Sequence, residues 1–243
     1  MNNLPIRKIL YFFPAAAGVL GLLLRFWLYG TGVDEKGLLI PSHPTNVLVF
    51  ILLAITMAAM VLCVTRLPQQ KLQKPFPKSL AGAVGCAVAA AGIVIGSISE
   101  LSSGDSVSTV SLVLSIIAAA CFVLLGLSRS KGQKASLLFC CATCVYFMVH
   151  LISQYRLWSA EPQLQTYFFP LLSSVLLMLC CYHRCVLDIK GTGLKQYAFF
   201  NRAALFCCLV SMNTENWSFY FAMACWTAAE LYLPEEQSDE AAE

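Results

Sequence analysis

The sequence predicts an all-α fold: a polytopic membrane helix bundle of about eight transmembrane helices, with both termini in the cytoplasm. Three observations predict it. Of the 243 residues, 58% are hydrophobic and only 12% are charged, whereas an average soluble domain is roughly a quarter charged. Eight apolar stretches approach the roughly 20 residues that a helix needs to cross a bilayer. Basic residues also collect in alternate loops between these stretches.

The composition excludes several classes of protein. With a mean hydropathy of +0.72, the chain does not fit a soluble globular enzyme, a disordered protein or a nucleic-acid binder. A cleavable signal peptide is not expected either, because the apolar run after Arg7 and Lys8 continues as far as Tyr29.

The predicted spans cover residues 10–29, 45–64, 80–99, 107–127, 135–154, 166–186, 197–214 and 217–233. The last two are the shortest, and only Glu215 and Asn216 separate them, so a tight hairpin that does not fully cross is an alternative. We assign residues 1–233 to a single transmembrane helix-bundle domain. Residues 234–243 form an acidic tail, which we expect to be disordered and cytoplasmic.

Basic residues set the expected orientation. Thirteen of the 16 Lys and Arg residues lie at the N-terminus, in the second and fourth loops, or in the region around the sixth loop. The other side of the membrane receives only Arg25, Lys36 and Arg156. The positive-inside rule therefore predicts a multi-pass protein of the cytoplasmic (cell) membrane with loops one, three, five and seven outside.

Small residues predict where helices pack closely. The third span repeats them at spacings of three and four, which gives one continuous face: Gly82, Gly85, Ala89, Gly92 and Gly96. In the first span, Gly18, Gly21 and Arg25 share a face, so we expect Arg25 to face protein rather than lipid.

Two further helices carry polar or small stripes that we expect to face the bundle interior. The stripe of the fifth span is Thr143, Tyr146, His150 and Gln154, and that of the seventh is Asn201, Ala204, Cys208, Ser211 and Glu215. Interhelical hydrogen bonding alone would also explain such stripes.

The polar residues of the outer third converge on a candidate binding vestibule that opens to the outside. Its predicted members are Arg25, Glu100, His150, Gln154, Arg156, Asn213 and Glu215. A buried charge needs a partner, so Arg25 is expected to pair with Glu100 or Glu215. At the inner end, Glu230 needs a cation, and Arg202 is the nearest candidate in a folded hairpin. The alternative is a solvated interfacial glutamate.

Loop one mixes glycines and prolines with the candidate binding residues Asp34, Glu35, Lys36 and His43. A capping loop and a functional lid are both open. The stretch from Arg25 to Pro44 resembles the first outer loop of uncharacterised multi-span membrane proteins of anaerobic Gram-positive bacteria. This resemblance implies no activity.

All twelve cysteines fall within predicted spans, so a disulfide framework is not expected. The same-face pairs, Cys140 with Cys144 and Cys181 with Cys185, offer zinc or an iron–sulfur cluster as an alternative. The expectation is that the chain binds no cofactor, because free cysteine also packs as a small apolar side chain.

We expect transport or binding of a small solute or ion. The alternatives are a membrane sensor or accessory subunit of a larger complex and, third, an intramembrane enzyme or cysteine-based redox protein. The hydrolase motifs HExxH and GxSxG are missing, which disfavours the enzyme. Expected partners are the lipid bilayer, an unidentified solute or ion, and a second copy or partner subunit, but no nucleic acid.

Overall fold

The computed structural model describes residues 4–32, 39–40, 43–67, 78–102, 108–158 and 167–230. This part of the chain is helical and contains no strand. Its helices are α1 (Leu4–Thr31), α2 (Pro44–Thr65), α3 (Leu80–Ser102), α4 (Ser108–Lys131), α5 (Leu137–Trp158), α6 (Phe168–Lys190), α7 (Leu194–Ser211) and α8 (Trp217–Ala229).

Six of the helices, α1 to α6, are long and apolar enough to cross a membrane, which confirms the predicted multi-span helical character. The other two are shorter, as expected for the last two spans. With 13 residues, α8 is about 20 Å long at 1.5 Å per residue, less than the roughly 30 Å of a bilayer core. Both the count of eight spans and the alternative, in which α7 and α8 form a tight hairpin that does not fully cross, therefore stay predictions.

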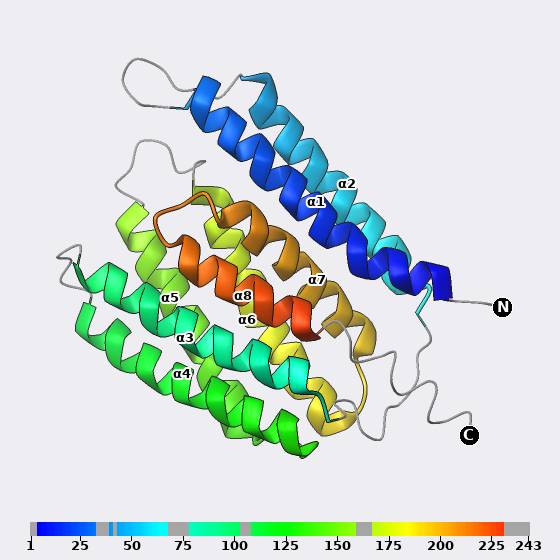
Figure 1. The fold of residues 1–243 in the computed structure, drawn as a ribbon, viewed down its shortest axis with the longest axis vertical. Helices are drawn as coiled ribbons and strands as arrows, with labels where there is room; N and C mark the ends of the chain where they lie inside the picture. The colour runs from blue at the N-terminus through cyan, green and yellow to red at the C-terminus, as the bar shows by residue number, and fades with distance from the viewer. Residues whose placement is uncertain are drawn as a thin grey trace.

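Six helices form a closed ring in which each helix packs against the next, in the order α3, α4, α5, α6, α7, α8 and back to α3. The pair α1 and α2 lies outside this ring and packs against α7 (Figure 1). Helix α7 is thus surrounded by α1, α2, α6 and α8. This explains why 12 of its 18 residues are buried although the helix is not strongly apolar.

The interior of the ring is filled by large apolar side chains. Phe122 of α4 meets Trp226 of α8 edge to face at a centroid distance of 5.0 Å, and Phe147 of α5 at 6.4 Å. All three are fully buried, as is Leu177 of α6. The ring therefore encloses a packed core in which aromatic side chains from three helices interlock.

The predicted small-residue faces are confirmed as close helix contacts. A side chain at Gly85 or Gly92 of α3 would collide with Ala229 or Ala222 of α8, respectively. Likewise, Gly18 of α1 faces Leu209 of α7 with no room for a methyl group. These glycines permit the close backbone approach that stabilises helix pairs in membranes, where lipid removes most of the hydrophobic drive to associate.

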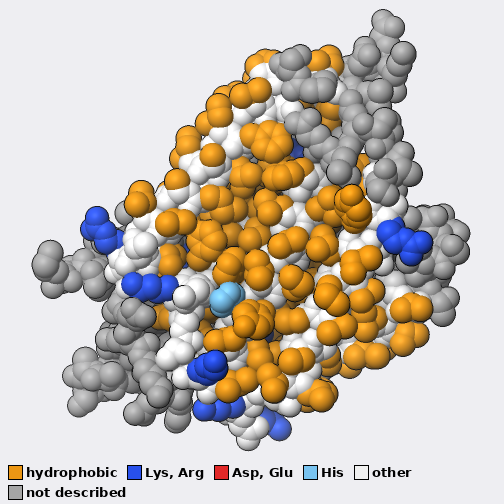
Figure 2. All heavy atoms as spheres, turned by 180° about the vertical axis from the view of Figure 1, so that it is seen from behind, with side chains coloured by type: hydrophobic (Ala, Val, Ile, Leu, Met, Phe, Trp, Pro, Cys, Tyr) orange, Lys and Arg blue, Asp and Glu red, His pale blue; other side chains and the backbone are white. Residues whose placement is uncertain are grey.

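The outer surface is apolar over a wide area. Figure 2 shows one face on which hydrophobic side chains cover most of the surface between clusters of Lys and Arg. Large exposed side chains on the long helices include Leu23, Trp27, Leu62, Val110 and Leu138. A contiguous apolar surface of this kind is compatible with contact to lipid.

Candidate functional site: two buried polar clusters

The first cluster surrounds Arg25, which lies six residues before the end of α1. Its side chain is only 3% exposed, as the sequence predicted from its position on the glycine face. The guanidinium donates a hydrogen bond from Nη2 to the Tyr29 hydroxyl at 3.2 Å. It also lies 5.4 Å from the ring centroid of Phe169 at the start of α6. Aromatic faces stabilise a desolvated cation, so Arg25 keeps its charge inside the protein.

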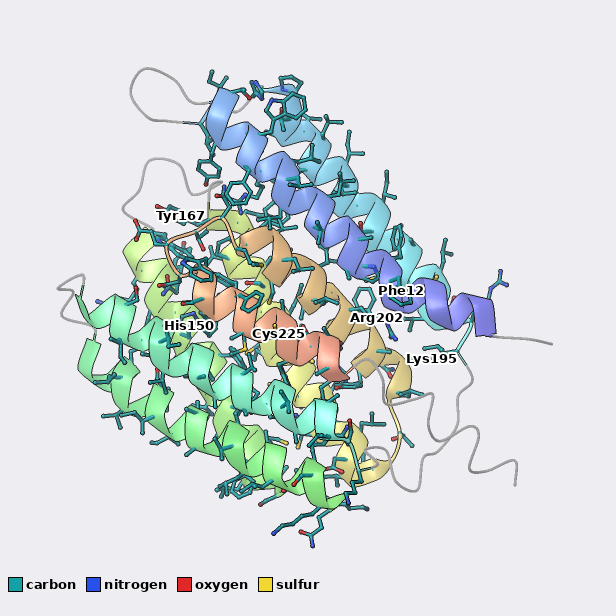
Figure 3. The ribbon with its side chains drawn as sticks, viewed as in Figure 1. Phe12, His150, Tyr167, Lys195, Arg202 and Cys225 are labelled. Carbon is teal, nitrogen blue, oxygen red and sulfur yellow. The ribbon has the colours of Figure 1, made fainter. Side chains whose placement is uncertain are left out.

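The polar stripe of α5 supplies two further buried polar side chains. His150 is buried between two rings, at 5.7 Å from Tyr146 of its own helix and 4.9 Å from Phe219 of α8. Gln154, one turn further along α5, is also buried. In Figure 3, His150 and Tyr167 lie toward the same end of the bundle. We call Arg25, His150, Gln154 and the aromatic side chains around them the outer cluster.

The remaining predicted vestibule residues lie in different environments. Arg156 and Glu215 are exposed, and Asn213 is half-buried in the turn between α7 and α8. His43 is the half-buried N-cap residue of α2 and lies against Gly32. The side chain of Glu100 and the residues Asp34, Glu35 and Lys36 lie outside the described residues.

The predicted ion pair of Arg25 stays a prediction. The Glu100 side chain is not among those described, and Glu215 is exposed whereas Arg25 is buried. The partners of Arg25 include the aromatic side chains of Tyr29 on α1 and Phe169 on α6.

The second cluster lies at the opposite end of the bundle, around the buried carboxylate of Glu230 directly after α8. Its Oε1 is 3.1 Å from Nη2 of Arg184 on α6 and 3.8 Å from Nε of Arg129 on α4. Its Oε2 accepts a hydrogen bond from the Tyr197 hydroxyl on α7 at 3.2 Å. That hydroxyl accepts one in turn from Nδ2 of Asn201 at 3.4 Å. We call these five residues the inner cluster.

Close packing holds the two arginines of the inner cluster in place. Arg129 lies against the backbone of α3, since a Cβ at Gly82 would be 3.1 Å from its Nε. The Arg184 guanidinium lies 5.9 Å from the Trp226 ring centroid. Nearby, the buried Asp188 of α6 accepts a hydrogen bond from the Ala135 backbone N–H at 2.8 Å, which ties α6 to the start of α5.

The structure corrects the predicted partner of Glu230. The sequence correctly required a cation there, but chose Arg202, whereas the structure supplies Arg184 and Arg129. Arg202 shares its face of α7 with Phe206 and Leu209, and Leu209 contacts α1. In Figure 3, Arg202 accordingly lies on α7 near Phe12 of α1. Its Nη1 donates a hydrogen bond to the Ala198 carbonyl at 3.4 Å.

The candidate metal ligands lie together without forming a binding set. All twelve cysteines are free thiols. Cys140 and Cys185 lie within hydrogen-bonding reach of each other, while Cys144 donates to the Met178 carbonyl at 3.8 Å. Among the residues that the structure describes, no three His, Cys, Asp or Glu side chains are grouped so that they could hold a metal ion.

Chemically, both clusters present guanidinium groups inside a helix bundle, and such groups bind carboxylate or other oxyanions. Comparison with known proteins adds no assignment, because no family model, curated protein or solved structure matches the chain significantly.

Proposed function

We propose that the chain is a multi-pass protein of the cytoplasmic membrane that binds a small anionic solute in the outer cluster and transports it. The buried Arg25 carries this proposal. A cation inside a transmembrane bundle is costly and marks substrate or ion pathways. Its aromatic surroundings and the polar groups of His150 and Gln154 would bind the rest of a small solute.

The proposed orientation places the outer cluster outside and both termini in the cytoplasm. The distribution of basic residues supports this orientation, because 13 of the 16 Lys and Arg residues lie toward the side proposed to be cytoplasmic. Each of α2 to α6 runs opposite to the helix before it, and α7 and α8 form a hairpin. As a result, α1 begins and α8 ends toward the same end of the bundle (Figure 1). This arrangement agrees with the proposed parity.

Solute binding can be tested by the thermal stability of the detergent-purified protein in a panel of chloride, phosphate, sulfate, acetate, lactate and glutamate salts at equal ionic strength. At least one of these anions should stabilise the wild type. Substitution Arg25→Gln should weaken its apparent affinity about tenfold or more, since hydrogen bonds to charged groups contribute about 1.5–3 kcal/mol. The matched control is Arg66→Gln, because Arg66 is an exposed arginine at the opposite end of the bundle.

Binding in this outer cluster is excluded if stabilisation by the anion survives Arg25→Gln unchanged, or if no anion of the panel stabilises the wild type. Uptake of the stabilising anion into proteoliposomes then separates transport from the alternative of a sensor, which would bind the anion without moving it.

A further inference from the structure

The inner cluster has the composition of a receptor for a carboxylate. The groups that contact the Glu230 carboxylate come from three helices: Arg129 from α4, Arg184 from α6 and Tyr197 from α7. None of them comes from α8, the helix that delivers Glu230. Helices α4, α6 and α7 therefore position these groups without α8, and the Glu230 carboxylate lies between them.

The geometry is selective for an oxyanion. Two cationic groups approach Oε1 and a hydroxyl donates to Oε2, so both carboxylate oxygens are recognised separately. Guanidinium groups are suited to this task because they stay charged and offer several N–H donors in one plane. The Arg184 and Glu230 side chains are 3% and 0% exposed, and charge pairing is strong where water is excluded.

The wall of the cluster holds hydrogen-bonding capacity beyond what Glu230 uses. Trp226 Nε1 is buried and has no hydrogen-bond partner among the described residues, and the same holds for Asn201 Oδ1. The indole N–H can only donate, and its ring lies beside the Arg184 guanidinium. An anion with a larger polar group than a glutamate side chain would find a further donor and an acceptor here.

The carboxylate of Glu230 lies at an unfavourable end of its own helix, so a free carboxylate can replace it among these groups. It caps the C-terminus of α8, where the partial negative charge of the helix dipole disfavours a carboxylate. A free anion in the same place would be bound by the same groups without being fixed to that helix end. Exposed Lys131 and Lys134 flank this end of the bundle and would attract anions toward it.

We propose that Arg129, Arg184 and Tyr197 form a second binding site, for a small carboxylate at the inner end of the bundle, and that Glu230 is a tethered ligand which an incoming carboxylate replaces. This site shares no residue with the outer cluster, so its test does not depend on the proposed function.

The test is chemical rescue of Glu230→Ala by acetate. This substitution removes the Cγ, the carboxyl carbon and both oxygens, which are the heavy atoms of acetate. The melting temperature of the purified variant should fall below that of the wild type. Acetate, but not chloride at equal ionic strength, should then restore at least half of the loss, with saturable dependence on concentration. The matched control is Glu215→Ala, at the exposed turn of the hairpin, which acetate should not stabilise beyond the wild type.

Equal effects of acetate and chloride on Glu230→Ala would overturn the proposal and leave a closed structural ion pair. If the variant does not stay folded in chloride, the readout becomes its monodisperse fraction on size-exclusion chromatography after solubilisation in acetate or chloride. The proposal predicts a larger fraction in acetate and is wrong if the two fractions are equal. The Arg25→Gln variant should leave the rescue unchanged, which separates this site from the outer cluster.

Discussion

Glu230 shows how a charge is accommodated where its own helix disfavours it. A carboxylate at a helix C-terminus meets the negative end of the dipole, and burial removes its hydration. Arg184 at 3.1 Å, Arg129 at 3.8 Å and the Tyr197 hydroxyl at 3.2 Å compensate for both. Replacing one member of such a buried pair costs about 3–5 kcal/mol, because it leaves the other charge uncompensated.

A double-mutant cycle distinguishes the true partner of Glu230 from the one that the sequence suggested. Combining Glu230→Gln with Arg184→Gln should give a coupling free energy of about 1–3 kcal/mol, the range found for residues in direct contact. The same cycle with Arg202→Gln should be additive within about 0.5 kcal/mol. Unfolding of the detergent-solubilised protein provides the measurement. Equal coupling in both cycles would contradict the assignment.

The sequence predicted the residues of the outer cluster better than those of the inner cluster. The burial of Arg25, His150 and Gln154 followed from stripes at helical spacing. Arg129 and Arg184 were counted only as part of the basic surplus of the cytoplasmic loops. The overlooked signal is again spacing, since Arg129 continues the buried face of Ala118, Phe122 and Leu125 at steps of four, three and four.

At the scale of the helices, small residues determine which faces touch. Gly85, Gly92 and Gly96 of α3 face α8, whereas Gly18 and Gly21 of α1 face α7. A face of this kind can be read from sequence because it needs only helical periodicity. The identity of the partner helix cannot be read from the sequence in this way, because it depends on contacts between residues far apart in the chain, such as Gly85 and Ala229. The sequence thus predicted the packing face of α3 but not that α8 fills it.

Substitution of Gly92 tests this packing. In Gly92→Ala, the new methyl group would collide with Ala222 of α8, so the helices must separate, at a cost of about 1–3 kcal/mol. The matched control is Gly30→Ala near the end of α1, where nothing lies within 4 Å of the added Cβ. That variant should be neutral, or more stable by up to about 1 kcal/mol because alanine favours the helix. Thermal unfolding in detergent compares the two, and equal stability of both variants would contradict the close α3–α8 contact.

For the whole molecule, the two clusters of buried charged side chains lie apart, one around Arg25 and one around Glu230. Between the clusters, Phe122, Phe147 and Leu177 fill the interior of the ring with large apolar side chains. Movement of a solute from one cluster to the other therefore requires the packing between α8 and its neighbours to change.

The proposed function requires a bundle that spans the membrane with the Arg25–His150 end outside and the Arg129–Glu230 end in the cytoplasm. Two exposed positions report on these ends: Glu215 in the α7–α8 turn and Gln133 between α4 and α5. The measurement is labelling of Glu215→Cys and Gln133→Cys with a membrane-impermeant maleimide in intact and permeabilised cells. The wild type, whose twelve cysteines all lie in helices, sets the background. If the proposed orientation is right, Glu215→Cys reacts in intact cells and Gln133→Cys reacts only after permeabilisation. Labelling of both from the same side, or the reverse pattern, would contradict it.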